Sequence, residues 1–192
     1  MPSRLGSKKA VFLDRDGTMI EDIGYLSRED QVEFFPWTVD AIRALARAGF
    51  EVVVVTNQSA IARGLTTEST VEAIHAAMAR VLEGGGARVA AYYYCPHHPD
   101  GIVEPYARAC DCRKPGRGLI DRAARDLNID PGRSFVVGDK WSDVRLGRAV
   151  GAKAILVRSG NGAAEEGKPH ADVAADVVVD NLAGAASWIL KC

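Results

Sequence analysis

Two carboxylates stand close together at the end of an apolar run near the start of the chain. The run Val11-Phe12-Leu13 has the composition of a buried β-strand, and Asp14 and Asp16 follow it at positions i and i+2. In extended backbone both side chains lie on the same side, about 7 Å apart. Like charges that close are tolerated when a cation lies between them or when one carboxyl stays protonated. The pair therefore suits a nucleophile, a general acid and a divalent metal, although most Asp-x-Asp-Gly strings are simple turns.

Three further polar segments follow or precede apolar patterns in a similar way. Thr56 ends a β-branched run, Asp139 follows Phe135-Val136-Val137, and Lys114 precedes a helical pattern. Each has an ordinary explanation on its own: a strand end for Thr56, a helix N-cap for Asp139 and a surface position for Lys114. The carboxyl ends of parallel strands, however, meet at one edge of a sheet, where ligands bind. Together the segments predict one polar site at that edge.

The elements that would position these residues alternate between strand and helix patterns. Such alternation is typical of an α/β fold with a mostly parallel sheet and helices on both faces. The strands are expected at 9–14, 50–56, 89–94, 134–137, 153–157 and 177–179. The helices are expected at 36–48, 67–83, 118–127 and 142–150, with a last short helix ending at Leu190. A Gly/Ala/Glu-rich loop is expected at 159–171, and no repeat or linker divides the single domain predicted over 1–192.

Composition narrows the class of partner. Among 192 residues there are 24 Lys and Arg against 25 Asp and Glu, a net charge of −1, so the basic surface of a nucleic-acid-binding protein is not expected. The apolar runs have strand length and the first residues lack an apolar signal segment, so we expect neither a membrane span nor secretion. The expectation is a cytoplasmic monomer that acts on a small molecule.

A second cluster of chemically active side chains lies between the third strand and the helix at 118–127. Cys95-Pro96-His97-His98 and Cys110-Asp111-Cys112 offer three thiolates and an imidazole, a ligand set that structural Zn²⁺ accepts. The segment 95–112 has no periodic apolar pattern, so a bound zinc ion would explain how it stays ordered. His98 could replace His97 as the ligand. Unrelated cysteines or a redox pair are the alternatives to zinc, since the spacing differs from the commoner Cys-x-x-Cys knuckle.

Taken in order, these motifs resemble those of the haloacid dehalogenase (HAD) superfamily of phosphotransferases over essentially the whole chain. The resemblance implies a three-layer Rossmann-like fold. It also implies that Asp14 is the nucleophile, that Asp16 is the general acid and base, and that Thr56 and Lys114 hold phosphate oxygens. By the same resemblance, Mg²⁺ would be bound by Asp14, Asp139 and the main-chain carbonyl of Asp16. Asp143 would either orient the metal site or cap the following helix.

The cysteine loop directly before Arg113-Lys114-Pro115 resembles a narrower group, the heptose bisphosphate and histidinol-phosphate phosphatases. The strings Asp22–Leu26 and Thr56–Gly64 favour the heptose side of that group. The substrate contacts implied by the resemblance are Asp22, Gly24, Tyr25, Asn57, Gln58, Ser59, Arg113 and Lys140. Ala60 and Pro36-Trp37 depart from the usual pattern of Gly and Pro-Gly, outside the residues that contact the reacting phosphate.

The function that the resemblance implies is removal of the 7-phosphate of D-glycero-D-manno-heptose 1,7-bisphosphate, in the synthesis of activated heptose for a cell envelope. Arg113, a planar fork beside Lys114, would clamp the distal phosphate. No segment is long enough for a cap domain, so an open site is expected. The alternatives are a histidinol-phosphate phosphatase, a nucleic-acid end-processing phosphatase and a non-catalytic zinc module.

Overall fold

The computed structural model of the protein, which describes residues 6–168 and 172–192, contains a six-stranded sheet in the order β3-β2-β1-β4-β5-β6. Every adjacent pair is parallel; Val11 of β1, for example, is paired with Val52 of β2 and with Phe135 of β4. The strands are β1 (Ala10–Leu13), β2 (Glu51–Asn57), β3 (Ala91–Cys95), β4 (Phe135–Gly138), β5 (Lys153–Val157) and β6 (Val177–Val179).

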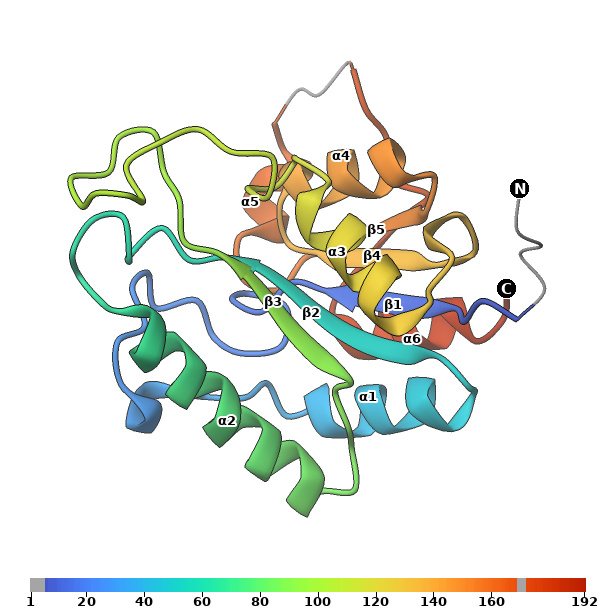
Figure 1. Ribbon diagram of the computed structural model, residues 1–192. Helices are drawn as coiled ribbons and strands as arrows, with labels where there is room; N and C mark the ends of the chain where they lie inside the picture. The colour runs from blue at the N-terminus through green and yellow to red at the C-terminus, as the bar shows by residue number, and fades with distance from the viewer. Residues whose placement is uncertain (1–5, 169–171) are drawn as a thin grey trace.

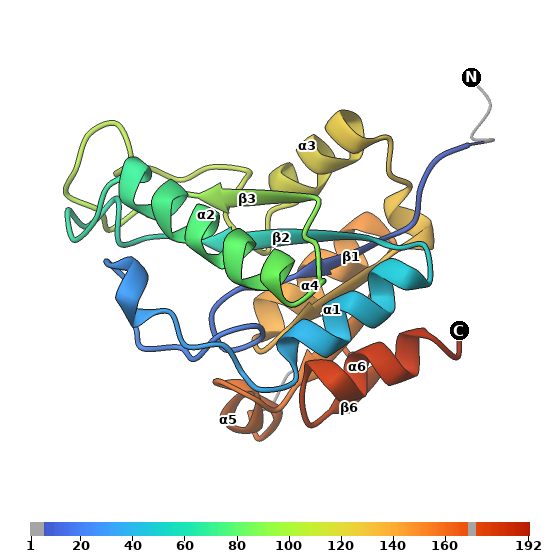
Figure 2. The same ribbon diagram turned by 90° about the horizontal axis from the view of Figure 1, so that it is seen from below.

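Helices follow the strands and cover both faces of the sheet (Figures 1 and 2). They are α1 (Thr38–Arg47), α2 (Glu68–Gly84), α3 (Gly118–Leu127), α4 (Trp141–Val150), α5 (Gly162–Glu166) and α6 (Leu182–Ile189). Their ends carry local signals: the Thr67 side chain accepts a hydrogen bond from the backbone N–H of Thr70 at the start of α2, and Asn128 in the left-handed conformation ends α3. Two short 3₁₀ turns, η1 (Glu29–Gln31) and η2 (Pro131–Arg133), lie in the connections.

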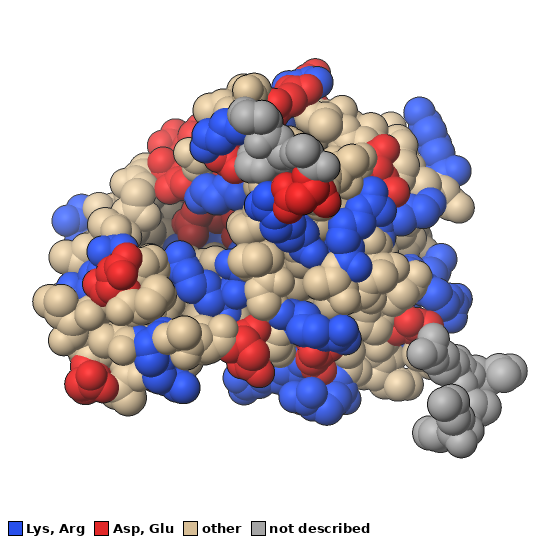
Figure 3. Space-filling view, turned by 90° about the horizontal axis from the view of Figure 1, so that it is seen from above, with Lys and Arg blue, Asp and Glu red and all other residues tan. Residues whose placement is uncertain are grey.

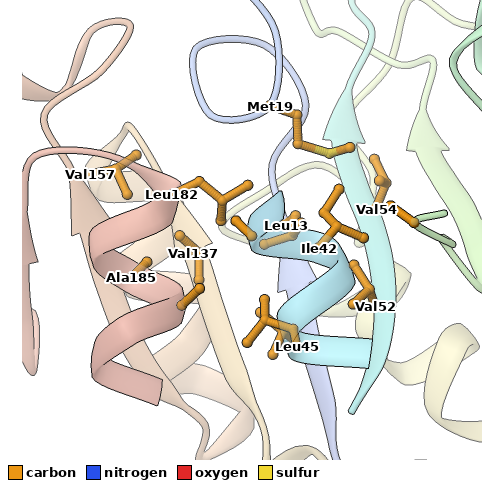
Figure 4. Close-up of a cluster of buried hydrophobic side chains, with 14 of the residues drawn as sticks. Leu13, Met19, Ile42, Leu45, Val52, Val54, Val137, Val157, Leu182 and Ala185 are labelled. Atoms are coloured by element: carbon orange, nitrogen blue, oxygen red, sulfur yellow. The ribbon is translucent and has the colours of Figure 1, made fainter. Parts of the chain in front are cut away.

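Two buried layers follow from the alternation of side chains along each strand. Val11 and Leu13 point to the face covered by α1, α2 and α6, whose apolar side chains complete that core (Figure 4). Ala10 and Phe12 point to the opposite face, where α3 and α4 pack. Because helices cover both faces, the strands are apolar on both sides, which is why their sequences read as continuous runs.

The predicted three-layer α/β fold is confirmed, and each expected strand and helix is present with bounds that differ by at most two residues. One expectation is wrong: within the segment 159–171, which was expected to be a loop, residues Gly162–Glu166 form the short helix α5. A five-residue helix carries too little periodicity to be read from sequence. Residues 169–171 of that segment lie outside the described residues.

The strand order reverses between β1 and β4, and the connections after β1 and β3 are long. Ligands of such sheets bind beyond the carboxyl ends of the strands at this reversal. The connections at 14–37 and 96–117 contain, among the described residues, only the turn η1 and no further helix or strand, consistent with the absence of a cap domain. No helix in the described parts of the chain has the length and apolar character needed to cross a bilayer.

Candidate active site and metal centres

A buried ion cluster forms where β1, β4 and the segment before α3 meet. The Lys114 Nζ lies 2.7 Å from Asp14 Oδ1 and 2.6 Å from Asp143 Oδ1. Burial alone would lower the pKa of Lys114, but the charges of Asp14 and Asp143 outweigh it and raise that pKa, so the ammonium stays charged. Asp14 Oδ1 also accepts a hydrogen bond of 2.8 Å from the backbone N–H of Arg15. The lysine therefore fixes the orientation of the Asp14 carboxylate.

Asp139 completes a set of three buried carboxylates. Oxygens of Asp14, Asp139 and Asp143 all lie within 4.8 Å of one another, and Asp139 is 0% exposed. Burial, followed by the charge of Asp14, raises the pKa of Asp139. Asp139 Oδ2 accepts hydrogen bonds from Asn161, whereas its Oδ1 is buried with no hydrogen-bond partner among the described residues.

This donor set fits magnesium. Mg²⁺ prefers hard oxygen ligands and needs few from the protein because it keeps several waters. A cation among these carboxylates would satisfy Asp139 Oδ1 and offset the repulsion that raises its pKa. Asp143 joins the two side chains predicted for this site. It also accepts a hydrogen bond of 3.2 Å from the backbone N–H of Lys140, so it contacts the ion cluster and caps α4.

A glycine-lined wall encloses the carboxylate of Asp139. Gly17 has a φ of +83°, and a Cβ added there would lie 2.2 Å from Asp139 Oδ2. Gly160, on the loop after β5, would meet the Gly17 Cα at 2.3 Å if it carried a Cβ. The turn that follows Asp16 must therefore be glycine both for its conformation and for its closeness to the carboxylate.

The predicted catalytic and substrate-binding residues come together in one cleft of about 410 Å³ at this edge of the sheet. Figure 3 shows a hollow on this side with acidic atoms in its depth and Lys and Arg atoms around it. Asp139 lies beneath the cleft rather than on its surface. The lining residues are Asp14, Asp16, Asp22, Gly24, Tyr25, Thr56, Asn57, Gln58, Ser59, Arg113, Lys114 and Lys140, with Ala60 and Ser142 in addition.

Asn161 was missed by the sequence reasoning and connects two parts of the site. Its side-chain N–H₂ donates to Asp139 Oδ2 at 3.1 Å and to Asp22 Oδ2 at 2.9 Å. Asp22 also pairs with Lys140 Nζ at 3.3 Å. Burial opposes the effect, but the Gly24 N–H, Lys140 and Asn161 together lower the pKa of Asp22. Asn161 comes shortly after the carboxyl end of β5, so the rule that singled out Asp139 would also have found it.

The four zinc ligands predicted from the sequence form a compact cluster. The Sγ atoms of Cys95, Cys110 and Cys112 are 3.1–3.4 Å apart, and His97 Nδ1 lies 3.3 Å from the Cys112 Sγ. The sulfurs are too far apart for disulfides. His98 Nδ1 instead accepts from the N–H of Asp100, so the geometry favours His97 over the alternative His98.

Three thiolates and an imidazole are a ligand set of tetrahedral zinc, whose bonds are about 2.0–2.3 Å long, and the four side chains would need to spread by only a few tenths of an ångström to hold the ion. Binding through Nδ1 would put the ring proton of His97 on Nε2. The Arg108 guanidinium, 3.0 Å from that Nε2, would then turn away, since it too can only donate.

The zinc-ligand cluster lies directly beside the cleft. Figure 2 shows the loop 96–117 beyond the arrowhead of β3. Cys112 is followed at once by Arg113 and Lys114, and Lys114 is anchored at its backbone N–H by Asn57 Oδ1 at 2.9 Å. The position of Lys114 thus depends on both β2 and the cysteine loop.

Comparison with known proteins agrees with this geometry. A family model described as HAD-hydrolase-like matches residues 111–185. The chain is 44% identical over 187 residues to the D-glycero-β-D-manno-heptose-1,7-bisphosphate 7-phosphatase of Escherichia coli K12, covering 96% of this chain and 95% of that protein. Its identity to the protein of the same name from Pasteurella multocida is 41%, over 90% of this chain and 94% of that protein.

Solved structures show the same relationship. The D,D-heptose 1,7-bisphosphate phosphatase from B. bronchiseptica, complexed with magnesium and phosphate, superposes with a TM-score of 0.84 at 34% identity, covering 95% of this chain and 98% of that one. A putative HAD-like phosphatase from Mesorhizobium loti gives a TM-score of 0.83 at 33% identity, with coverage of 96% and 87%.

Proposed function

Since this chain belongs to the D-glycero-β-D-manno-heptose-1,7-bisphosphate 7-phosphatase family of HAD-like hydrolases, we propose that it removes the 7-phosphate of D-glycero-D-manno-heptose 1,7-bisphosphate, in the synthesis of activated heptose for the cell envelope. One observation carries the proposal beyond family membership. The buried Asp14–Lys114 pair lies in a cleft that also holds Arg113 and Lys140, so a second set of cations faces the same substrate.

Asp14 attacks the phosphorus of the 7-phosphate in line. Its Oδ1 already accepts from Lys114 and from the Arg15 N–H, which leaves Oδ2 as the attacking atom. A bond forms between Asp14 Oδ2 and phosphorus as the bond from phosphorus to the sugar oxygen breaks. Asp16 gives its proton to the departing alkoxide, so the products of this half are a sugar alcohol and an aspartyl phosphate.

In the second half, Asp16 removes a proton from a water that attacks the phosphorus of the aspartyl phosphate. The phosphorus–Oδ2 bond breaks, which returns Asp14 as a carboxylate and releases inorganic phosphate. Lys114 and Thr56 hold the non-bridging oxygens in both halves. When bound by Asp14, Asp139 and the Asp16 carbonyl, magnesium supplies positive charge that offsets the charge of the phosphoryl oxygens.

The distal 1-phosphate is held by Arg113, and Lys140 also lines the cleft. Arg113→Ala should raise KM for the sugar bisphosphate roughly 10- to 150-fold, which corresponds to the loss of one charge-assisted hydrogen bond of about 1.5–3 kcal/mol. KM for a small monophosphate should hardly change. Arg117→Ala is the matched control, because Arg117 is exposed and pairs with Asp121. Equal losses on both substrates would contradict the clamp.

The histidinol-phosphate alternative lacks a distal phosphate, so phosphate release from the two substrates, assayed side by side, tests the proposed substrate directly. The test counts against the proposal if histidinol phosphate is hydrolysed with the higher kcat/KM.

We propose in addition that Cys95, His97, Cys110 and Cys112 bind one zinc ion, and that the protein acts in the cytoplasm as a monomer on this small sugar bisphosphate. Three clustered thiols in the ligand arrangement of a zinc site suit a reducing compartment, where disulfides rarely form.

A further inference from the structure

A buried arginine lies behind the catalytic carboxylates. Arg15, the residue between Asp14 and Asp16, is 1% exposed. Its Nε lies 3.1 and 3.2 Å from the two oxygens of Asp16, and its Nη2 lies 3.0 Å from Asp16 Oδ1. The same Nη2 donates to Gln58 Oε1 at 2.9 Å. A buried guanidinium is costly unless its donors are paired, so these contacts fix its position.

The Gln58 amide links this arginine to the cleft. Its Nε2 donates to Asp16 Oδ2 and to Thr56 Oγ1, each at 2.9 Å. Asp16, Gln58 and Thr56 all line the cleft. One guanidinium therefore orients both the acid–base carboxylate and the amide that contacts it, and a displacement of Arg15 would displace both.

Arg15 is itself held from the far side by His75, in the middle of α2. His75 is 5% exposed, and its Nε2 lies 3.1 Å from Arg15 Nη1. An arginine can only donate, so Nε2 carries the lone pair and Nδ1 the proton. Burial, followed by the charge of Arg15, lowers the pKa of His75 to about 3, which keeps the ring neutral. Stacking on Tyr92, with centroids 4.8 Å apart, fixes the ring.

We propose that His75 is a positioning residue for the acid–base step, acting through Arg15 on Asp16. The proposal rests on the proposed phosphatase function and assigns α2, an element outside the catalytic motifs, a part in it. By holding Arg15, His75 orients the Asp16 carboxyl toward the oxygen of the leaving group. Loss of this orientation should lower the rate most for leaving groups that must be protonated as they depart.

Three variants distinguish an effect on the orientation of Asp16 from an effect on side-chain packing. His75→Phe keeps a ring to stack on Tyr92 but removes the acceptor. His75→Gln restores an acceptor oxygen on a flexible side chain. Tyr92→Phe is the packing control, because the Tyr92 hydroxyl is buried and has no hydrogen-bond partner in the part of the chain that the structure describes, so its removal leaves the hydrogen bonds of the site unchanged.

The readout is kcat/KM for phenyl phosphate and p-nitrophenyl phosphate, two esters of similar shape. The nitrophenolate departs without a proton far more readily than phenolate. Because kcat/KM reports only the steps up to departure of the alcohol, later hydrolysis of the aspartyl phosphate does not enter it. In His75→Phe we expect the ratio of p-nitrophenyl to phenyl phosphate to rise about tenfold or more over the wild type. His75→Gln should recover most of that change, and Tyr92→Phe should not alter the ratio.

The proposal is overturned if His75→Phe lowers kcat/KM for both esters by the same factor. It is also overturned if the ratio of the two kcat/KM values in His75→Gln is no nearer to the wild-type ratio than that in His75→Phe. Where His75→Phe does not fold, His75→Asn, whose shorter amide falls short of Arg15, takes its place. The variants are also compared by kcat on the sugar bisphosphate, which should decrease in the order wild type, His75→Gln, His75→Phe. A wild-type protein that hydrolyses none of the three phosphates would instead refute the proposed function.

Discussion

Lys114 is the residue on which the electrostatics of the site depend. It separates two carboxylates that would otherwise face each other in the interior, and its own charge survives burial only because both are there. Such mutual dependence makes the loss of one partner costly and the loss of two less so, since a single deletion leaves an uncompensated buried charge.

Lys114→Met should lower the free energy of unfolding by about 3–5 kcal/mol, the cost of leaving buried carboxylates unpaired. Adding Asp143→Asn should restore part of that loss, because one of the two stranded charges is then gone. Urea unfolding of the two single variants and the double variant measures the coupling. Losses that simply add would contradict the picture of one shared cluster.

Gly17 is the second residue of the site at which the structure restricts the amino acid, because only glycine fits there. Gly17→Ala would place a methyl group 2.2 Å from Asp139 Oδ2, so we expect an inactive protein that no longer binds Mg²⁺. The matched control is Gly49→Ala, where φ is also positive but no atom lies within 4 Å. Both variants pay about 1 kcal/mol or more for the left-handed conformation, and only Gly17→Ala should lose activity. Equal activity in the two would show that the close approach is unimportant.

Among the elements, the loop 96–117 carries both the proposed zinc ligands and Lys114. It has no strand or helix, and its anchors include the Cys/His cluster, the N–H groups of Ile102 and Val103 that donate to the Ala62 carbonyl, and the Asn57–Lys114 contact. The loop also delivers Lys114 to the ion cluster, so a zinc ion bound at the Cys/His cluster would couple metal content to catalysis.

Cys110→Ser should abolish zinc binding, expose the loop to protease and lower kcat on every phosphate ester, because Lys114 loses the support of the cysteine loop and keeps only its contacts with Asn57, Asp14 and Asp143. Cys192→Ser is the control, since Cys192 is exposed and distant in sequence from the cluster. Elemental analysis and limited proteolysis report the two effects. A Cys110→Ser protein that keeps one zinc ion and full activity would rule out the assigned ligand set.

The elements that the sequence predicts well are those with long patterns. Each strand is a continuous apolar run because both faces of the sheet are covered, and the residues after β1, β2 and β4 could be placed at one edge from topology alone. The helix α5 has five residues and no repeated pattern, so it and the neighbouring Asn161 were read as plain loop.

The sequence does not predict the contacts between side chains of different elements. Arg15 looks like a spacer within the Asp-x-Asp motif, and nothing in its neighbours shows that it is buried against His75, 60 positions later. His75 equally reads as one more polar position on a helix. Pairings of this kind become visible only when β1, β2 and α2 are packed together.

Across the complete sheet, the cleft lies where the strand order reverses, so ligands contact segments from both halves of the fold. Binding to the folded state alone raises its stability by mass action. Mg²⁺, supplied at about one hundred times its dissociation constant, should add about 2.7 kcal/mol. At about 2–4 °C per kcal/mol for a chain of this size, the thermal midpoint should rise by roughly 5–10 °C.

Asp139→Asn is the control for this experiment, because it removes a charge from the metal site without altering the surface of the cleft. It should show little of the rise. A shift of the same size in the variant would mean that the ions bind elsewhere.

The positions of the ion-cluster residues along the chain have a consequence for synthesis of the protein. Asp14, Lys114 and Asp143 are drawn from three distant places, and the last of them is supplied only after three quarters of the chain has been made. A growing polypeptide on the ribosome therefore holds the proposed nucleophile, Asp14, long before the partners that orient it, and we expect fragments that stop short of α4 to lack activity. We expect activity toward phosphate esters only in chains that extend past Asp143.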